Sequence, residues 1–275
     1  MQLRPFSIPA PFKIMGILNC TPDSFSDGGR FIHVDSAIRH ACQLVEDGAD
    51  IIDIGAESTR PGAAEISSSL EWERLEPILN QLKKELPAHV AISVDTRKPD
   101  TMLKAADSGV QFINNVNGLA PGPVLRRLSG YRDLSYIAMH MHKCPQTMQI
   151  IPLEGLAAIE KVDDFFSMAN RELQKHGFSQ DRLWFDPGIG FGKSDQVNLC
   201  LMARTPEYSK RYKMVLGVSR KSWIGRCLGI SDPESRDHPS KIAELSLALS
   251  GAKIIRTHDV KNLAQLRDVV YKTEV

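Results

Sequence analysis

Short, continuous apolar runs alternate along the chain with longer segments in which apolar residues recur at helical spacing. The short runs predict buried strands, since polar or turn-forming residues follow each of them, and the longer segments predict amphipathic helices. The predicted strands are 12–18, 50–55, 91–94, 112–113, 136–139, 183–185, 214–218 and 253–255. The predicted helices are 35–48, with Asp35 as N-cap, then 69–86, 99–108, 123–128, 157–176, 197–208, 240–250 and 260–271. Strand and helix therefore alternate eight times.

This alternation runs through the chain without a linker or a change of composition, which predicts one α/β domain with a parallel sheet covered by helices. Eight units within 275 residues match the size of a closed (β/α)8 barrel. We therefore expect residues 1–275 to form a single domain, with residues 1–11 as an N-terminal preamble. An open doubly wound sheet is the alternative, and it is disfavoured because no nucleotide-binding fingerprint marks a switch point.

Composition and charge narrow the class of protein. Hydrophobic residues make up 42% of the chain and the net charge is +1, with Lys and Arg spread along the sequence. Neither a nucleic-acid partner nor a membrane partner is expected from this pattern. The cysteines are odd in number and never form a C-x-x-C pair, which is typical of reduced thiols; they are Cys20, Cys42, Cys144, Cys200 and Cys227. Without a signal-peptide pattern or a run long enough to span a bilayer, we expect a soluble cytoplasmic protein.

The segment 184–193, WFDPGIGFGK, carries the first candidate functional residue. Asp186 stands where a buried strand ends, and Pro187 stops strand pairing because it has no N–H to donate. The glycines that follow let the backbone approach a ligand closely. The segment is not a phosphate-binding P-loop, because only three residues separate Gly188 from Gly192. A simple Gly-rich turn after a core strand remains the alternative.

Most of the other predicted strands also end in polar or charged residues. Such residues gather at the carboxyl-end mouth of a barrel, where active sites of this fold lie. The residues at the mouth are Asn19, Glu57, Thr59, Arg60, Asp95, Asn114, His140, Asp186, Ser219, Lys221, Arg256 and His258. Any single one could be a rim residue or a helix cap, as Asp95 and Thr96 illustrate, but together they favour a binding site.

The chemistry of this ring of residues predicts the kind of ligand. Asp95, Asn114 and Asp186 suit a planar heterocycle that carries an amino group and ring N–H donors. Lys221 and Arg256 can meet a carbonyl group and stack on a ring face. The donors suited to phosphate oxygens are Asn19, Arg60, Arg256 and His258. We therefore expect a flat heterocycle that carries phosphate.

Two other motifs have simpler interpretations. His140 and His142 have the H-x-H spacing of barrel metallohydrolases, but no matching set of metal ligands follows the other strands, so a structural role or packing against the ligand is favoured. The charged run 71–74, EWER, is expected to be a solvated helix face.

Six segments then resemble bacterial dihydropteroate synthases over nearly the full chain. They are MGILNCTPDSFSDGG at 15–29, DIGAESTRPGA at 53–63, VDTRKP at 94–99, FDPGIGFGK at 185–193, GVSRKSWIG at 217–225 and RTHDV at 256–260. The resemblance implies a TIM barrel, usually a homodimer. It also implies a transferase that joins p-aminobenzoate to 6-hydroxymethyl-7,8-dihydropterin diphosphate with Mg²⁺ and releases diphosphate. The family's mechanism breaks the bond to diphosphate first and leaves a pterin-stabilised cation that the amine captures.

The resemblance also implies roles for individual residues. The implied pterin-binding set is Asp95, Asn114, Met139, Asp186, Lys221 and Arg256. The implied diphosphate-binding set is Asn19, Thr59, Arg60, Arg256 and His258, with Asn19 also the metal contact. The implied p-aminobenzoate-binding set is Thr59, Arg60, Pro61, Phe191 and Ser219. Lys221, Arg256, Asp95 and Asp186 are the implied catalytic residues.

The sequence departs from the family pattern at Ala56, Asn115 and Lys143-Cys144. The doublet Asn114-Asn115 also leaves open which amide reaches the pterin. Two alternatives remain: a related pterin-binding barrel that transfers a methyl group from methyltetrahydrofolate to a corrinoid, and a non-catalytic pterin-binding protein. The TPDSF and ESTRPG segments argue against the first, and the retained diphosphate-end residues argue against the second.

Overall fold

The computed structural model describes residues 11–20, 30–58, 65–143, 147–148 and 150–272, with only the backbone described at 30–33. Its strands form a closed barrel in chain order, and each strand pairs in parallel with the next. The strands are β1 (Lys13–Asn19), β2 (Ile51–Gly55), β3 (Ala91–Asp95), β4 (Phe112–Asn115), β5 (Ser135–Met139), β6 (Leu183–Asp186), β7 (Lys213–Leu216) and β8 (Ile254–Thr257). The predicted (β/α)8 barrel is confirmed.

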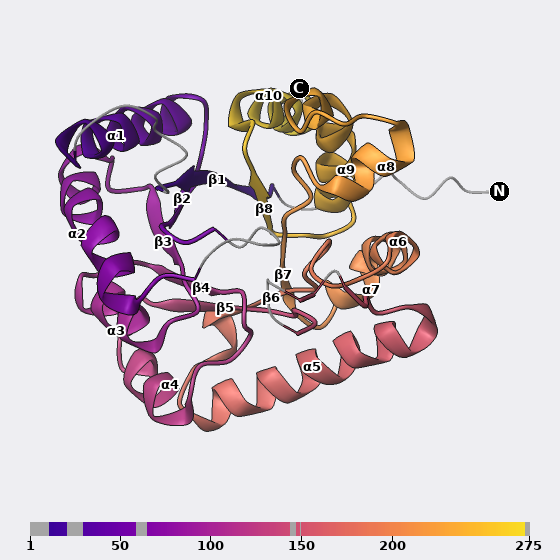
Figure 1. Ribbon diagram of the computed structural model, residues 1–275, viewed down its shortest axis with the longest axis horizontal. Helices are drawn as coiled ribbons and strands as arrows, with labels where there is room; N and C mark the ends of the chain where they lie inside the picture. Colours follow the sequence, from indigo (N-terminus) through magenta and orange to yellow (C-terminus); the bar gives the residue numbers. More distant parts are fainter. Residues whose placement is uncertain (1–10, 21–29, 59–64, 144–146, 149, 273–275) are drawn as a thin grey trace.

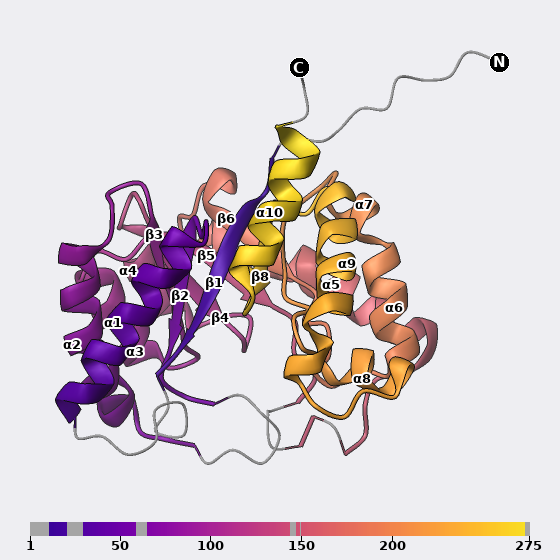
Figure 2. The ribbon, with the colours of Figure 1, turned by 90° about the horizontal axis from the view of Figure 1, so that it is seen from above.

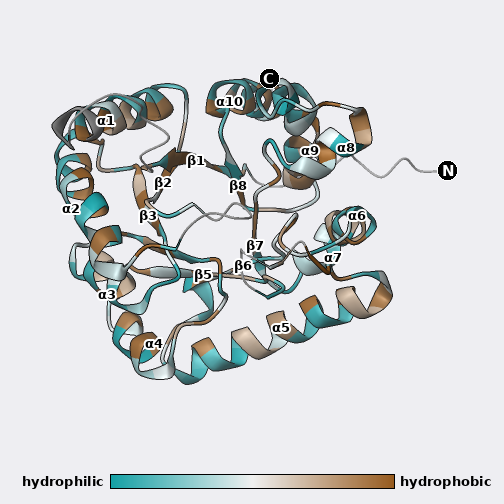
Figure 3. Cartoon of the chain, viewed as in Figure 1, coloured by the Kyte–Doolittle hydropathy of each residue, from teal (hydrophilic) through white to brown (hydrophobic). Residues whose placement is uncertain are grey.

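Helices surround the barrel on all sides (Figure 1). They are α1 (Arg30–Glu46), α2 (Ser68–Glu85), α3 (Pro99–Asp107), α4 (Gly122–Ser129), α5 (Gly155–Lys175), α6 (Asp195–Ala203), α7 (Thr205–Tyr208), α8 (Ser222–Leu228), α9 (Asp237–Leu249) and α10 (Val260–Tyr271). Short 3-10 turns, η2 (Gln180–Arg182) and η3 (Glu234–Arg236), precede β6 and α9. The helices mix hydrophobic and hydrophilic residues, as expected for elements that cover a sheet on one side and face water on the other (Figure 3).

Two predicted helices need correction, and one observed helix has no predicted counterpart. The first helix begins at Arg30 instead of Asp35, so Asp35 lies inside α1 and is not its N-cap. The predicted helix 197–208 is divided at Arg204, which ends α6 and begins α7, because Pro206 in the first turn of α7 has no N–H to continue the ladder. The helix α8 was not predicted, since seven residues are too few to show a helical period.

Two apolar layers hold the barrel. The larger lies between the strands and the helices, and the smaller fills the inside of the barrel. The inner layer, which forms an apolar plug inside the barrel, consists of Met15, Ile51, Phe112, Ile137, Val215 and Ile254. Side chains alternate between the two faces of a strand, so the residues two positions further along these strands also point into the barrel. This parity decides which polar residues reach the mouth.

Helix α10 ends beside the start of β1, at the end of the barrel opposite the mouth (Figure 2). An ion pair between Arg267 and Asp50 stabilises this end. Arg267 of α10 donates to Asp50 Oδ2 at 2.5 Å and to the backbone carbonyl of Gly48 at 3.1 Å. Asp50 Oδ2 also accepts the backbone N–H of Ile14 at 2.7 Å. The last helix is thereby fastened to the first two strands, at the face of such barrels that serves stability and not catalysis.

Candidate active site

A polar layer lies directly above the apolar plug inside the barrel. Counting two residues on from the plug gives Asp53 from Ile51, Asn114 from Phe112, Met139 from Ile137 and Arg256 from Ile254. Asp186 likewise lies two residues after Trp184, which packs on the same plug. Residues far apart in sequence therefore meet at one level, because each lies two residues beyond the plug on the inward face of its strand.

Arg256 joins the carboxylates of this layer. Its Nε donates to Asp53 Oδ2 at 2.6 Å, and its Nη2 donates to Asp95 Oδ2 at 3.0 Å. Asn114 Nδ2 donates to the same oxygen of Asp53 at 3.2 Å. Asp95, Asn114 and Arg256, all predicted to bind one ligand, are thus brought together around Asp53.

Asp53 is a candidate site residue that lies outside the set predicted from the sequence. It is fully buried, and its Oδ1 has no hydrogen-bond partner among the described residues. A signal was present, since Asp53 is the only charged residue of the strand IIDIG and has the same parity as Ile51. A buried acceptor without a partner is costly, so this oxygen is a candidate for a ligand donor.

Asp186 lies at the end of β6 with its side chain buried, and burial raises the pKa of this carboxyl above its usual value. Its Oδ1 accepts the backbone N–H of Gly188 at 2.7 Å. Gly188 has φ +66°, and a Cβ there would lie 2.0 Å from the carbonyl oxygen of His140. Only glycine fits this position, so the turn that holds Asp186 depends on the sequence that follows it.

Lys193, the last residue of the same segment, is buried and donates to three backbone carbonyls. Its Nζ lies 3.1 Å from the oxygen of His140, 2.9 Å from that of Gly188 and 3.0 Å from that of Phe191. The Gly-rich segment is therefore a tightly held turn around Lys193, and it fastens the loop after β6 to the end of β5. The turn is structural and it holds Asp186 at the end of β6, while the ligand-binding role of Asp186 stays a prediction.

Lys221 begins α8 beside the polar layer. Its Nζ lies 4.1 Å from the centroid of the Phe191 ring, which is a cation–π distance. Burial lowers the pKa of Lys221 to about 8, although Asp186 and Asp95 act to raise it. Lys221 and Phe191, predicted to contact different parts of the ligand, are therefore neighbours.

Ser219 and His258 form a second polar group, at the ends of β7 and β8. Ser219 Oγ lies 3.0 Å from His258 Nδ1 and accepts the backbone N–H of His258 at 3.2 Å. Burial, and then the positive charge of Arg256, lower the pKa of His258 to about 3. The imidazole is therefore neutral near pH 7 and can donate only one ring N–H.

The structure distinguishes the two asparagines. Asn114 contacts Asp53 inside the barrel, whereas Asn115 Nδ2 donates to the Tyr136 hydroxyl at 2.7 Å on the outer side of the strands. The departure at Asn115 thus lies outside the polar layer. His140 packs edge-on against Phe165, with ring centroids 5.4 Å apart, as the packing interpretation predicts. Met139, the residue before it, is buried in the polar layer.

Glu57, which the sequence analysis placed in the ligand-binding ring, is instead engaged by protein groups. It accepts from Arg97 Nε at 2.9 Å and forms an ion pair with Lys98 Nζ at 2.8 Å, and its other oxygen accepts the N–H of Ile66 at 3.1 Å. The interpretation of Glu71 as a solvated residue is wrong, because its side chain is fully buried and accepts from Thr96 Oγ1 at 2.8 Å.

The remaining predicted residues lie at or beyond the edge of the described chain. Asn19 ends β1 with its side chain exposed, and Ala56 is buried, with its carbonyl accepting from Arg74 Nη1 at 3.1 Å. Thr59, Arg60, Pro61 and Cys144 lie outside the described residues. Within the described ranges, no group of three His, Cys, Asp or Glu side chains is placed to hold a metal ion. In the same part of the chain, no helix has the length and apolar character needed to cross a membrane.

Asp95 gives the site a testable pH dependence. Burial, followed by the nearby carboxylates Asp53 and Glu71, raises the pKa of Asp95 to about 7, although Arg256 acts to lower it. The folded protein thus holds a proton that the unfolded chain releases near pH 4, so stability from Asp95 is present at low pH and is lost as the pH rises toward 7.

We expect Asp95→Asn to gain stability relative to the unsubstituted protein by at least about 1 kcal/mol between pH 4.5 and 8. Urea unfolding of both proteins at the two pH values measures this difference. Asp268→Asn, at an exposed ion pair with Lys272, is the control and should show little change. A difference for Asp95→Asn that stays constant with pH would contradict the electrostatic description of the site.

Comparison with known proteins identifies the family. The family model described as "Pterin binding enzyme" matches residues 15–258. The dihydropteroate synthase of Neisseria meningitidis serogroup C is 42% identical over 92% of this chain and 89% of its own. Among solved structures, Xanthomonas albilineans dihydropteroate synthase with 4-aminobenzoic acid has a TM-score of 0.87, with 34% identity over 97% of this chain and 94% of that one. The enzyme from Anaplasma phagocytophilum with bound 6-hydroxymethylpterin-monophosphate has a TM-score of 0.84, with 34% identity over 96% of this chain and 99% of that one. The barrel, the polar layer at its mouth and these relatives together show that the chain belongs to the pterin-binding enzymes, as a dihydropteroate synthase.

Proposed function

We propose that the polar layer binds the pterin ring of 6-hydroxymethyl-7,8-dihydropterin diphosphate, and that the mouth around Ser219 and His258 binds the diphosphate and p-aminobenzoate. The observation that carries this assignment is the cluster in which Arg256 contacts both Asp53 and Asp95 while Asn114 contacts Asp53. A pterin presents an amino group and ring N–H donors to carboxylates on one edge. Its carbonyl on another edge suits the ammonium group of Lys221.

The arrangement of charges favours a dissociative reaction. When the bond between the pterin methylene and diphosphate breaks, positive charge grows on the pterin and negative charge grows on the leaving group. The buried carboxylates of Asp95 and Asp186 stabilise the positive charge, because they are held in place before the reaction begins. Arg256 and Lys221 keep these carboxylates from repelling one another and bind the pterin.

The second step needs little help from a base. The amine of p-aminobenzoate is a weak nucleophile but attacks a cation, and its proton is lost to water or diphosphate afterwards. The ring of Phe191, held against Lys221, offers an apolar contact for the benzene ring, and Ser219 offers a hydroxyl for the carboxylate. Thr59, Arg60 and Pro61 remain predicted contacts for this half of the site, and Thr59 and Arg60 also for the diphosphate.

The residues present fit the Mg²⁺ that the family implies. Mg²⁺ usually keeps several waters and takes one or two protein oxygens together with substrate phosphates. Asn19, exposed at the end of β1, offers a single amide oxygen at the mouth. The described residues hold no three-residue cluster of His, Cys, Asp or Glu, which is the kind of site that an ion needing more protein ligands would take. Asn19 would be the protein ligand, and the ion would neutralise charge on the departing diphosphate.

The role of His258 is tested by its replacement. We expect His258→Ala to weaken the binding of inorganic diphosphate about tenfold, the effect of one lost hydrogen bond to a charged group, and to leave the affinity for a pterin without phosphate unchanged. Titration calorimetry with each ligand measures the two affinities. Equal weakening of both ligands would contradict the separation of the site into two halves.

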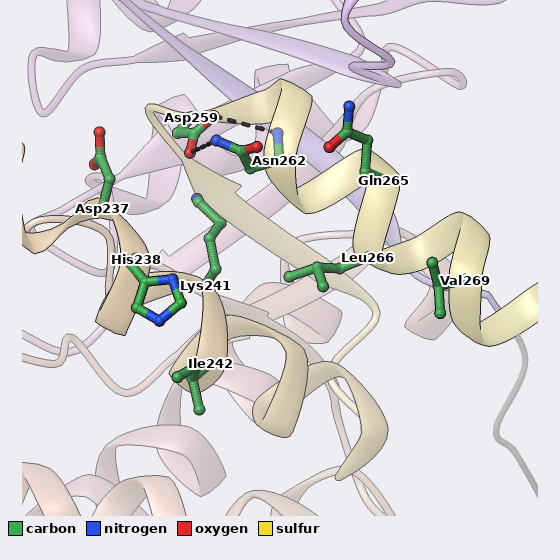
Figure 4. Close-up of a pocket in the computed structure, with 9 residues that line it drawn as sticks. All are labelled: Asp237, His238, Lys241, Ile242, Asp259, Asn262, Gln265, Leu266 and Val269. Atoms are coloured by element: carbon green, nitrogen blue, oxygen red, sulfur yellow. Dashed lines mark hydrogen bonds between the residues drawn. The ribbon is translucent and has the colours of Figure 1, made fainter.

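We also propose that the enzyme is a homodimer of cytoplasmic subunits. A pocket of about 600 Å³ lies between α9 and α10, and apolar side chains of both helices border it (Figure 4). Ile242 is 63% exposed and Val269 is 65% exposed, which is costly for a face that remains in water. This face is the best candidate among the described residues for the dimer surface.

Introducing a charge on this face is expected to separate the subunits. We expect Val269→Glu to be monomeric at concentrations where the unsubstituted protein is dimeric, as measured by sedimentation equilibrium. Leu199→Glu, which places the same charge on an exposed residue of α6, is the matched control and should remain a dimer. A dimeric Val269→Glu protein would place the interface elsewhere.

Turnover tests the proposed reaction as a whole. Purified protein is mixed with the dihydropterin diphosphate and Mg²⁺, with and without p-aminobenzoate, and diphosphate and dihydropteroate are both measured. One diphosphate per dihydropteroate is the expected result. Binding of the pterin diphosphate without any dihydropteroate would contradict the proposal.

A further inference from the structure

A buried ammonium group lies at the centre of the turn that follows β6. Lys193 is only 2% exposed, although its side chain can carry a charge. Its Nζ donates to the carbonyl oxygens of Gly188, Phe191 and His140, at 2.9, 3.0 and 3.1 Å. An ammonium group has three N–H donors and no acceptor, so these three carbonyls use all of its hydrogen bonds.

Packing alone does not explain a charge at this position. Removing a charged group from water is costly, and burial lowers the pKa of Lys193 to about 7, although Asp186 acts to raise it. A methionine side chain would fill a similar volume without that cost, but it could not donate to the carbonyls. The ammonium group is therefore explained by the backbone that it holds.

Gly188 connects Lys193 to the carboxylate of Asp186. The N–H of Gly188 donates to Asp186 Oδ1 at 2.7 Å, and its carbonyl accepts from Lys193 Nζ at 2.9 Å. Burial raises the pKa of Asp186, and the positive charge of Lys193 is among the charges that act to lower it. Lys193 therefore affects both the orientation and the ionisation of the Asp186 carboxylate.

The backbone of Phe191 is held by the same group. Its N–H donates to the carbonyl of Gly188 at 3.0 Å, and its own carbonyl accepts from Lys193 Nζ at 3.0 Å. With the backbone held on both sides, the ring of Phe191 lies 4.1 Å from Lys221 Nζ. One ammonium group thus fixes Asp186 and Phe191, which are predicted to contact different halves of the ligand.

Other contacts anchor the turn as a whole. The N–H of Gly190 donates to Asn198 Oδ1 on α6 at 2.8 Å, and the N–H of Leu153, just before α5, donates to the carbonyl of Gly192 at 2.8 Å. Neither contact involves the side chain of Lys193. A substitution of Lys193 should therefore displace groups within the turn and leave the turn attached to its neighbours.

We propose that Lys193 is a positioning residue for both substrates. Through the carbonyls of Gly188 and Phe191, it holds the Asp186 carboxylate for the pterin and the Phe191 ring for p-aminobenzoate. Lys193 has no donor left for a ligand, so it acts only through these neighbours. This inference rests on the proposed function for what Asp186 and Phe191 bind.

Lys193→Met in the full-length protein tests this role, since it keeps the size of the side chain and removes the donors. We expect KM for p-aminobenzoate to rise about tenfold and the affinity for a pterin without phosphate to weaken about tenfold. The affinity for inorganic diphosphate should stay the same, because the residues predicted to bind it follow other strands. Steady-state kinetics and calorimetry measure these quantities, each per folded molecule as determined by urea unfolding.

The outcomes separate this inference from the proposed function. If the unsubstituted protein forms dihydropteroate and Lys193→Met keeps both its KM and its pterin affinity, the inference is wrong and the proposed function stands. Equal weakening of all three ligands would show a general loss of structure and would also overturn the positioning role. An unsubstituted protein that forms no dihydropteroate would contradict the proposed function and this inference with it.

A double variant tests whether Lys193 acts through Phe191. Phe191→Ala should raise KM for p-aminobenzoate in the otherwise unsubstituted protein. In the Lys193→Met background it should raise KM by no more than about twofold, because effects at residues in contact are not additive when one acts through the other. If the two effects on KM multiply in full, Lys193 does not act through Phe191.

Arg182→Met is the matched control for the loss of a cation that holds the backbone. Arg182 lies at the opposite end of β6, and its guanidinium donates to the carbonyls of Ser129, Tyr131, Leu134 and Gly177. Its replacement should lower stability and leave KM and the pterin affinity unchanged. A rise in KM equal to that in Lys193→Met would overturn the specific role of Lys193.

Solid-state NMR of the unsubstituted protein needs no variant to fold. Lysine is labelled with ¹⁵N at Nζ and histidine with ¹³C at its carbonyl carbon, so that the contact between Lys193 and His140 gives a dipolar coupling. The 3.1 Å hydrogen bond and the C=O bond together place these two nuclei about 4 Å apart. We expect this coupling both without ligand and with a bound pterin. Its absence in either state would overturn the inference.

Discussion

Asp186→Asn is expected to lower kcat/KM roughly 100- to 1000-fold, because a neutral amide no longer balances the positive charge that grows on the pterin. The substitution preserves the size of the side chain, and the amide oxygen can still accept the N–H of Gly188, which Asp186 Oδ1 accepts at 2.7 Å. The loop after β6 should therefore stay in place. The loss should appear both in pterin affinity, measured by calorimetry, and in kcat, measured by product formation.

Asp181→Asn, at the opposite end of β6, is the control for this result. Asp181 precedes β6 in the turn η2 and is exposed, away from the mouth. Asp181→Asn changes the net charge by the same amount and should leave kcat/KM within about twofold. Unchanged pterin affinity and kcat in Asp186→Asn would remove Asp186 from the pterin site.

Arg256→Met is expected to lower the free energy of unfolding by about 3–5 kcal/mol, the usual cost of leaving a buried charge without its partner. Asp53 is fully buried and would lose its 2.6 Å contact with Arg256 Nε, while Asp95 would lose its 3.0 Å contact with Nη2. Two carboxylates would then face each other without a cation between them. Urea unfolding at pH 8 measures the loss, and product formation should fall to background.

A second substitution tests whether charge is the cause. Asp53→Asn in the Arg256→Met background should recover a large part of the stability, because one of the two unbalanced charges is gone, without recovering activity. Arg204→Met, at a partly exposed ion pair with Glu207, is the matched control and should cost about 1 kcal/mol or less. If the double variant is no more stable than Arg256→Met, the destabilisation does not come from the buried carboxylates.

The sequence was sufficient for the barrel, since each predicted strand is an apolar run of the right length and lies within about two residues of the observed one. The polar residue at the end of each strand also predicted most of the polar layer. The start of α1 at Arg30 was missed because Asp35 is a good N-cap residue and the residues before it carry no clear helical signal. The division between α6 and α7 depended on one proline inside a pattern that otherwise continued.

The partners of charged side chains could not be predicted, because they depend on contacts between distant segments. Glu57 meets Arg97 and Lys98, which are about 40 positions away in the chain, and so it is used within the protein. Glu71 was expected to face water but is buried against Thr96. Asp53 was overlooked as a residue inside a strand, although its parity with Ile51 places it in the polar layer. Asn114 and Asn115 both lie at the end of β4, and what distinguishes them is whether the side chain points into the barrel or away from it.

The two alternative functions agree less well with the family and with the site than a dihydropteroate synthase does. The chain belongs to the dihydropteroate synthases over most of its length, which sets it apart from a corrinoid methyl transfer. A non-catalytic binding protein would have no need of His258 and Ser219, which the structure holds 3.0 Å apart beside Arg256.

We propose that the bond to diphosphate breaks at the barrel mouth before the amine attacks, and an isotope experiment tests this order most directly. The dihydropterin diphosphate is prepared with a heavy oxygen isotope in the bridge between the pterin methylene and the first phosphorus, and it is incubated with enzyme, Mg²⁺ and benzoate in place of p-aminobenzoate. Reversible cleavage should move the label from the bridge to the non-bridging oxygens of the recovered substrate, at a rate comparable to normal turnover. A label that stays in the bridge, while the same enzyme converts p-aminobenzoate at its full rate, would contradict cleavage before attack.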